Sequence, residues 1–153
     1  MITYQQRDIT NVKIGIVAHG VNCQLKMGSG VALAIRKQWP GAYDAYMKGP
    51  QGKAALGQGI VVNVDGSVHE RLFVANCYTQ FNYGSDGAIY ADRDAIRSSL
   101  KEAYKWATFY HLNVFMPKIG CGLGGLDWDV DVLPIVTEVD DLFEDVNTFV
   151  CSL

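Results

Sequence analysis

The feature that most constrains the fold is an apolar segment that runs through a glycine-bearing loop into a helix pattern. Residues 12–17 form a nearly continuous apolar run, typical of a strand buried on both faces. Residues 18–30 are polar with glycines, and residues 31–37 read as a helix with a basic end. Free backbone N–H groups and the helix dipole favour an anion at such a junction. The pattern predicts either a phosphate site or a tight turn without a ligand.

A second junction of the same kind occurs later in the chain. Residues 114–116 are apolar, residues 117–128 are rich in glycine, and residues 129–143 have a helical pattern. Carboxyl ends of parallel strands meet at one edge of an α/β sheet, and ligands bind at that edge. Two anion-binding loops at one edge suit a diphosphate better than a single phosphate.

The remaining segments alternate between strands and helices and include one hairpin. Strands are expected at 2–5, 60–64, 68–78 and 147–153, helices at 41–48 and 93–111, and a turn at Asp65-Gly66 joins the hairpin strands. This alternation predicts an α/β protein with three layers, in which helices cover both faces of the sheet. We expect a single domain over residues 1–153, because no linker or repeat divides the chain.

Composition excludes several classes of protein. The net charge of −3 gives no electrostatic footprint for nucleic acid. No apolar run reaches the roughly 18 residues of a membrane helix, and no signal peptide precedes the first strand. The four cysteines are widely spaced, which argues against zinc and against a disulfide framework. We therefore expect a cytoplasmic protein with no metal, no cofactor and no membrane contact.

Taken together, these segments resemble a macro domain. The resemblance rests on Asp8-Ile9 after the first strand, on residues 19–32, on residues 117–124 and on Leu153. It implies a mixed six-stranded sheet between helices, with ADP-ribose bound in a cleft across the edge of the sheet.

Within that family the chain is more similar to one compact branch. The spacing His19-x-x-Asn22, the loop at 119–123, the following Trp128 and the final Leu153 carry this similarity. The branch contains ADP-ribose-1″-phosphate phosphatases and the terminal ADP-ribose protein glycohydrolase. It implies ADP-ribose or ADP-ribose-1″-phosphate as the ligand, with an ADP-ribosylated macromolecule as a further partner.

The resemblance also assigns residues to the ligand. Asp8 would accept a hydrogen bond from the adenine, with Ile9 and Leu153 near the base. The two glycine loops would hold the phosphates, and residues 79–81 would begin the wall of the distal ribose pocket. The ligand-binding residues expected on this basis are Asp8, Ile9, Gly20, Val21, Asn22, Met27, Gly28, Ser29, Gly30, Val31, Ala32, Thr79, Gln80, Phe81, Ile119, Gly120, Cys121, Gly122, Leu123 and Leu153.

The chain departs from the glycohydrolase pattern at two positions. The family's nucleophilic lysine corresponds to Gln80, and its aspartate base corresponds to Gly124. Gln80 is no nucleophile and Gly124 has no side chain. A lysine-dependent mechanism is therefore not expected here.

Three residues are candidates for catalysis. His19 either shuttles protons or fixes the loop by hydrogen bonding. Asp127 either acts as a general acid or caps the following helix, and Asn22 would stabilise developing charge. We expect a monomeric phosphatase that removes the 1″-phosphate from ADP-ribose-1″-phosphate by water attack. The alternatives are an ADP-ribosyl hydrolase acting on modified protein or nucleic acid, and a reader that binds ADP-ribose without changing it.

Overall fold

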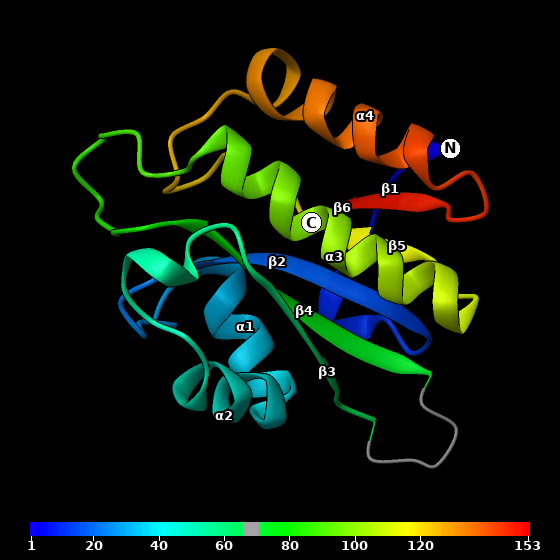
Figure 1. Ribbon diagram of the computed structural model, residues 1–153, viewed down its shortest axis with the longest axis horizontal. Helices are drawn as coiled ribbons and strands as arrows, with labels where there is room; N and C mark the ends of the chain where they lie inside the picture. Colours follow the sequence, from blue (N-terminus) through cyan, green and yellow to red (C-terminus); the bar gives the residue numbers. More distant parts are fainter. Residues whose placement is uncertain (66–70) are drawn as a thin grey trace.

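A computed structural model of the chain describes residues 1–65 and 71–153. In this part of the chain six strands form one sheet (Figure 1). The strands are β1 (Ile2–Gln6), β2 (Gly15–Asn22), β3 (Gly59–Asn63), β4 (Leu72–Gln80), β5 (Val114–Met116) and β6 (Thr148–Ser152). Their spatial order is β1-β6-β5-β2-β4-β3.

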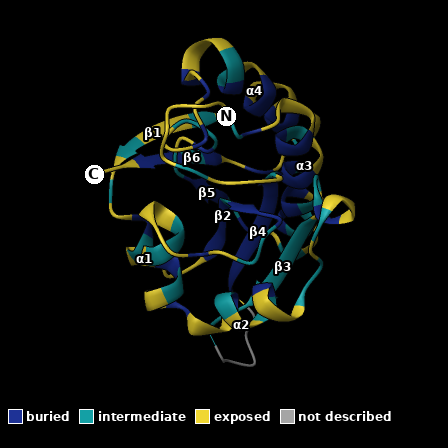
Figure 2. Ribbon diagram, turned by 90° about the vertical axis from the view of Figure 1, so that its left-hand side faces the viewer, coloured by how far each residue is buried: buried dark blue, intermediate teal, exposed yellow. Residues whose placement is uncertain are grey.

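Helices cover both faces of the sheet, as expected. The helices are α1 (Gly30–Gln38), α2 (Pro40–Lys48), α3 (Arg93–Tyr110) and α4 (Leu133–Leu142), with short helical turns at Ile9–Asn11, Lys53–Ala55 and Trp128–Val132. Helices α1 and α2 lie on one face, and α3 and α4 lie on the other (Figures 1 and 2). Strand β3 runs antiparallel to β4 and the other pairs are parallel, so the predicted mixed six-stranded α/β fold is confirmed.

Strand β2 is the central strand, and both of its faces are buried. Ile16 and Ala18 join the core beneath α3 and α4. Val17 and Val21 join the core above α1 and α2. Burial on both sides explains why the sequence shows a continuous apolar run rather than an alternating one.

The bounds of β2 differ from the prediction of a strand at 12–17. The strand starts at Gly15, where a Cβ atom would lie 2.7 Å from the Phe115 ring. It continues to Asn22 because residues 18–21 pair in register with Ala75–Tyr78 of β4. The residues from His19 to Asn22 therefore belong to the strand and not to the loop.

The predicted hairpin is present as β3 and β4, which pair from Gly59 opposite Cys77 to Asn63 opposite Phe73. Gly66 of its predicted turn and residues 68–70 of its predicted second strand lie outside the described residues. The predicted helix at 129–143 begins instead as a π-helical turn, Trp128–Val132, followed by α4. Pro134 near the start of α4 cannot donate an i→i−4 hydrogen bond, which accounts for the wider turn before it.

Two further features bear on the class of protein. Among the described residues no helix has the length and apolar character that crossing a bilayer demands. The described histidine, cysteine and acidic side chains nowhere gather in threes as a metal site would require. All four cysteines are free thiols.

Helix α3 depends on its N-cap, which gives a first prediction. The Asp92 carboxylate accepts a hydrogen bond from the Ala95 N–H at 2.8 Å. We expect Asp92→Ala to lower the free energy of unfolding by about 1 kcal/mol, the usual cost of a lost cap. Asp94→Ala is the control, because Asp94 lies two residues further on, is 95% exposed and forms an exposed ion pair with Arg97 but no cap bond. Urea denaturation measures both, and equal losses in the two variants would contradict the capping role.

Candidate functional site

A cleft of about 570 Å³ opens at the carboxyl edge of the sheet. Figure 2 shows the ribbon from this side of the molecule. The segments that line it follow the carboxyl ends of β2, β4 and β5. They are residues 19–22, Lys26 and 28–32; Thr79, Gln80 and 83–85; and 117–120 with 122–124. The structure thus brings together the two glycine loops that the sequence predicted to share one edge.

The first loop is shaped by the side chain of Asn22. Its Oδ1 accepts from the N–H groups of Gln24 (2.9 Å) and Lys26 (3.3 Å), and its Nδ2 donates to the Lys26 carbonyl (2.7 Å). The buried Tyr46 hydroxyl donates to the Asn22 carbonyl at 2.7 Å and accepts from the Lys26 N–H at 3.1 Å. Burial raises the pKa of Tyr46, which therefore stays a donor. Asn22 holds the loop in place, and its expected role in stabilising developing charge stays a prediction.

The start of helix α1 has no side-chain cap among the described residues. Ser29 is its N-cap, yet the Ser29 side chain forms no cap hydrogen bond. The first N–H groups of a helix have no acceptor within the helix, so an anion can accept from them. A Cβ atom at Gly28 or at Gly30 would meet nothing within 4 Å. This end of the cleft is therefore open down to the backbone.

The second loop is rigid at its base and open at its tip. Gly120 (φ +78°) packs so tightly that a Cβ atom would lie 2.9 Å from the Ile96 side chain, and one at Gly124 would lie 2.6 Å from the Gly120 carbonyl oxygen. The Gly124 carbonyl accepts from the N–H groups of Tyr90 and Ala91. At Gly122, between them, a Cβ atom would meet nothing within 4 Å. A ligand can therefore approach this backbone closely.

His19 lies inside β2 and is 1% exposed. Its Nε2 lies 2.6 Å from Asn76 Oδ1, and Asn76 Nδ2 donates to the Ala42 carbonyl. Since Oδ1 can only accept, Nε2 carries the proton, while the buried Nδ1 has no partner among the described residues. Burial lowers the pKa of His19 to about 4. Of the two roles weighed for His19, the structure supports fixing β2 against β4 and α2 rather than shuttling protons.

Asp127 is exposed and does not line the cleft. Its carboxylate accepts from the Val130 N–H at 2.8 Å and caps the turn Trp128–Val132. The helix-cap alternative is therefore confirmed, and the role of Asp127 as a general acid stays a prediction.

The wall at the distal end of the cleft contains one unpartnered polar atom. The Thr79 Oγ1 is buried and has no hydrogen-bond partner among the described residues. It lies where a Cβ atom on Gly20 would be 2.6 Å away, so the glycine lets this hydroxyl approach β2. The neighbouring Gln80 lines the cleft and donates from Nε2 to the Asn82 carbonyl at 2.8 Å.

Several expected ligand residues lie outside the lining. The Asp8 carboxylate accepts from the N–H and hydroxyl of Thr10, which lowers its pKa, and it caps the turn Ile9–Asn11. Burial raises the pKa of the Cys121 thiol to about 11, in keeping with a packed cysteine. The expected residues that do not line the cleft are Asp8, Ile9, Met27, Phe81, Cys121, Asp127 and Leu153. The adenine contacts assigned to Asp8, Ile9 and Leu153 stay predictions.

The sequence also missed residues that do line the cleft: Lys26, Tyr83, Gly84, Ser85, Pro117, Lys118 and Gly124. Lys26 and Lys118 are the only charged side chains among the described lining residues, which include no carboxylate. Each lysine lies within one of the glycine loops, and this position in the sequence could have identified both as lining residues. The cleft is therefore locally positive in a chain whose net charge is −3.

Comparisons with known proteins agree with this geometry. The family model described as "Macro domain" matches residues 18–134. A DNA ADP-ribosyl glycohydrolase of Mycobacterium tuberculosis (strain ATCC 25618 / H37Rv) is 29% identical over 133 residues, which are 84% of this chain and 36% of that protein. The chain thus spans about a third of the length of this curated relative.

Solved structures share the fold along the whole chain. A protein of unknown function from Bacteroides thetaiotaomicron superposes with a TM-score of 0.80 at 31% identity, covering 99% of this chain and 98% of that one. Thermosipho africanus DarTG, solved in complex with ADP-ribose, superposes with a TM-score of 0.77 at 20% identity, covering 99% of this chain and 42% of that one.

Buried His19 makes stability depend on pH in a defined window. Its pKa is about 4 in the fold and about 6.5 when unfolded, so the unfolded chain binds more protons between these values. As pH falls from 7 to 4.5, we expect the fold to lose about 2–3 kcal/mol. Urea denaturation at each pH measures this loss of unfolding free energy. The loss should be smaller in His19→Gln, because glutamine does not titrate. A flat profile for the wild type above pH 4.5 would contradict the assignment, and an NMR titration of the ring tests it if the variant does not fold.

Proposed function

The chain belongs to the macro domain family, and from this premise we propose that its cleft binds ADP-ribose and that the protein hydrolyses the bond joining the distal ribose to an acceptor. The observation that carries the proposal is the pair of open glycine loops at one edge of the sheet. Uncapped N–H groups at the start of α1 face the cleft from one side, and the backbone around Gly122 faces it from the other. A diphosphate fits between them.

The diphosphate fixes the orientation of the rest of the ligand. With the phosphates held by residues 28–32 and 119–123, the distal ribose lies against Gly20, Thr79 and Gln80. The unpartnered Thr79 Oγ1 is then satisfied by a ribose hydroxyl, because a buried hydroxyl without a partner is costly. The adenosine extends toward the C-terminal end of β6 and Asp8.

The chemistry of the lining supports charge stabilisation. No carboxylate lies among the described lining residues, and His19 is neutral and buried. Backbone N–H groups and the ammonium groups of Lys26 and Lys118 stabilise negative charge that develops when the acceptor leaves. Gln80 and Ser85 at the distal wall can orient the attacking water.

The acceptor favoured by the relatives is DNA, because the mycobacterial relative is named a DNA ADP-ribosyl glycohydrolase. A 1″-phosphate is the second candidate. It is favoured by the two lysines, which add positive charge beyond what the backbone offers to a diphosphate. A reader without turnover is the third, favoured by the lack of a carboxylate in the described lining.

Turnover separates these candidates. We expect the purified protein to release ADP-ribose from ADP-ribosylated single-stranded DNA faster than phosphate from ADP-ribose-1″-phosphate. Thr79→Val should lower kcat/KM about tenfold through the lost hydrogen bond, while Thr137→Val, on the exposed face of α4, should not. Faster phosphate release would make the protein a phosphatase, and binding of ADP-ribose without any turnover would make it a reader.

Ligand binding itself is tested at Gly28. A Cβ atom there meets open space, and unlike Gly30 (φ +58°) its backbone suits any residue. Gly28→Glu adds a negative charge where the diphosphate binds, so we expect the Kd for ADP-ribose to rise about tenfold or more by calorimetry. Gly41→Glu is the matched control, because Gly41 is equally open but lies on α2, outside the cleft. Unchanged affinity in Gly28→Glu would overturn the assignment of the cleft.

A further inference from the structure

The rim of the cleft between β4 and α3 carries an exposed aromatic side chain that the proposed function leaves unused. We propose that Tyr83, together with Lys26 and Lys118, forms a subsite for a nucleotide of a single-stranded nucleic acid that carries the ADP-ribosyl group. This inference rests on the proposed function and names the part of the cleft that holds the acceptor.

Tyr83 is placed to stack on a base. Its side chain lines the cleft and is 48% exposed, so part of it is accessible to a ligand. Its N–H donates to Asn82 Oδ1 at 2.9 Å, and the Asn82 carbonyl accepts from Gln80 Nε2 at 2.8 Å. The backbone that carries the ring is therefore held to the end of β4 by these hydrogen bonds. Stacking of a base on an aromatic ring is a general mode of binding single strands.

The rim that carries Tyr83 is tied to both glycine loops. On one side the Phe81 carbonyl accepts from the Cys23 N–H at 3.1 Å and from Gln24 Nε2 at 3.2 Å. On the other side the Tyr90 N–H donates to the Gly124 carbonyl at 2.9 Å. These contacts fix both ends of the rim, and so the backbone that carries Tyr83, relative to the phosphate loops. Little ordering entropy is then lost when a base stacks on it.

The rim also packs against itself. The Tyr90 hydroxyl donates to Asp86 Oδ1 at 2.8 Å, and Asp86 also accepts from the Ala88 N–H. The Tyr90 ring fills the space in which a side chain at position 84 would lie, since a Cβ atom on Gly84 would be 2.3 Å from the Tyr90 hydroxyl. Tyr90 thus supports the backbone next to Tyr83 and is not itself part of the lining.

The lysines of the cleft complement a phosphate backbone. Neither Lys26 nor Lys118 forms an ion pair with any described residue, so both ammonium groups are available. An ADP-ribose diphosphate and an adjacent phosphodiester both gain from them. Two cations and one exposed aromatic ring lining the same cleft match a nucleotide unit, whereas a peptide acceptor offers no fixed anion next to a planar ring.

The same cleft disfavours a base that stays in a duplex. The modified base has to bring the distal ribose to Gly20 and Thr79 inside the cleft, and a base stacked in a helix cannot do so without being flipped out. With only two cations in the described lining and a net charge of −3, the contact with nucleic acid is local. The geometry therefore points to a short single-stranded segment.

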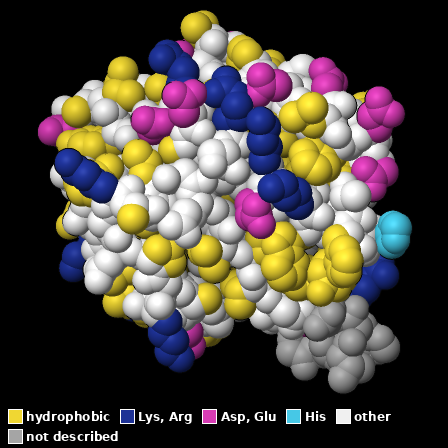
Figure 3. Space-filling model, in the orientation of Figure 1, with side chains coloured by type: hydrophobic (Ala, Val, Ile, Leu, Met, Phe, Trp, Pro, Cys, Tyr) yellow, Lys and Arg dark blue, Asp and Glu magenta, His cyan; other side chains and the backbone are white. Residues whose placement is uncertain are grey.

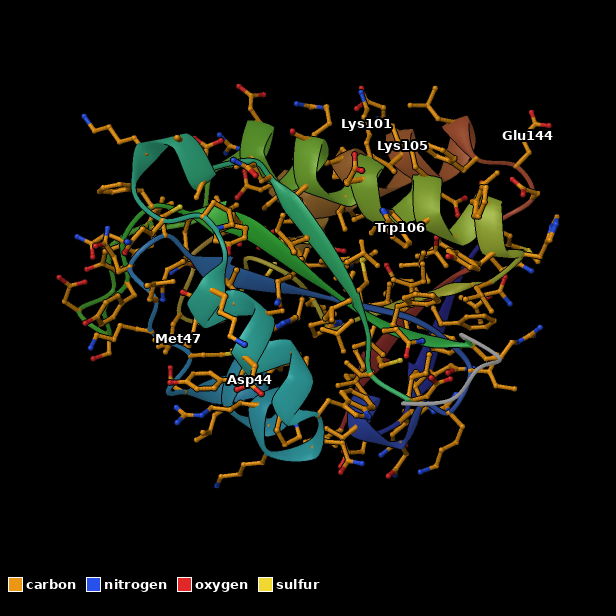
Figure 4. All side chains as sticks on the ribbon, turned by 60° about the horizontal axis from the view of Figure 1, so that its bottom comes forward. Asp44, Met47, Lys101, Lys105, Trp106 and Glu144 are labelled. Atoms are coloured by element: carbon orange, nitrogen blue, oxygen red, sulfur yellow. The ribbon has the colours of Figure 1, made fainter. Side chains whose placement is uncertain are left out.

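A second exposed surface provides matched controls. Glu102, Lys105, Trp106, Phe109 and Tyr110 surround a shallow apolar depression on α3. In Figure 4, Lys105 and Trp106 lie on α3 away from the loops at the left of the view, and Figure 3 shows large hydrophobic side chains on this same face. Phe109 is 75% exposed. Phe109→Ala and Lys105→Gln thus remove an exposed ring and an exposed cation outside the cleft.

The test compares two ligands in each variant by calorimetry. One is a single-stranded oligonucleotide of about ten nucleotides with one ADP-ribosylated base, and the other is free ADP-ribose. We expect Tyr83→Ala to weaken binding of the oligonucleotide about tenfold more than binding of free ADP-ribose. Tyr83→Phe should restore most of the difference because the ring is kept. The double variant Lys26→Gln, Lys118→Gln should bind the oligonucleotide with a weaker dependence on salt. We expect the slope of log K against log salt to become shallower by about 1.4.

The outcomes are distinct. Equal losses for both ligands in Tyr83→Ala would overturn the subsite, as would a loss of the same size in Phe109→Ala. A third ligand is a peptide with an ADP-ribosylated glutamate. If Tyr83→Ala weakens binding of this peptide as much as binding of the oligonucleotide, the acceptor is a protein and the nucleotide subsite is overturned. A Tyr83-dependent preference for the oligonucleotide without release of ADP-ribose would leave the subsite standing and refute the proposed hydrolase.

Discussion

The burial of β2 on both faces is the constraint on which the rest of the structure depends. Its apolar side chains serve the cores on both sides of the sheet, so the strand has to run through the middle of the molecule. Its carboxyl end then emerges between the ends of β4 and β5. The loops that follow these three strands meet at one place, and the cleft is a consequence of the strand order.

Two groups of glycines shape the cleft in different ways. At Gly20, Gly120 and Gly124 a Cβ atom would collide with a neighbour, so these glycines allow segments to pack closely. At Gly28, Gly30 and Gly122 a Cβ atom would meet open space, so these glycines leave room for a ligand at the backbone. The first group makes the walls rigid, and the second makes the anion site accessible. Sequence alone does not separate the two groups, because a glycine that packs closely and a glycine that leaves open space look the same in the sequence.

Much of the fold and part of the site follow from the sequence for local reasons. The glycine-rich loop after the apolar run 114–116 marks the end of β5, and Asp92 is a recognisable cap, whereas β2 continues five residues past its predicted end, to Asn22. The role of His19 does not follow, because its partner Asn76 lies 57 residues away and burial sets its pKa. Tyr83 is missed for a different reason. An exposed tyrosine in a polar loop carries no pattern, and its place at the rim is set by contacts with both glycine loops.

The composition of the lining narrows the chemistry further. With no carboxylate among the described lining residues and a neutral, buried His19, the cleft offers no strong acid to protonate a leaving group. An acceptor that departs as a stabilised anion needs no such acid. A carboxylate, a phosphate and an imide-type nucleobase meet this condition, whereas an alcohol or an amine does not. The field of Lys26, Lys118 and the backbone N–H groups favours that departing anion. The lack of a carboxylate in the described lining therefore bears on the class of acceptor and does not by itself exclude the proposed hydrolysis.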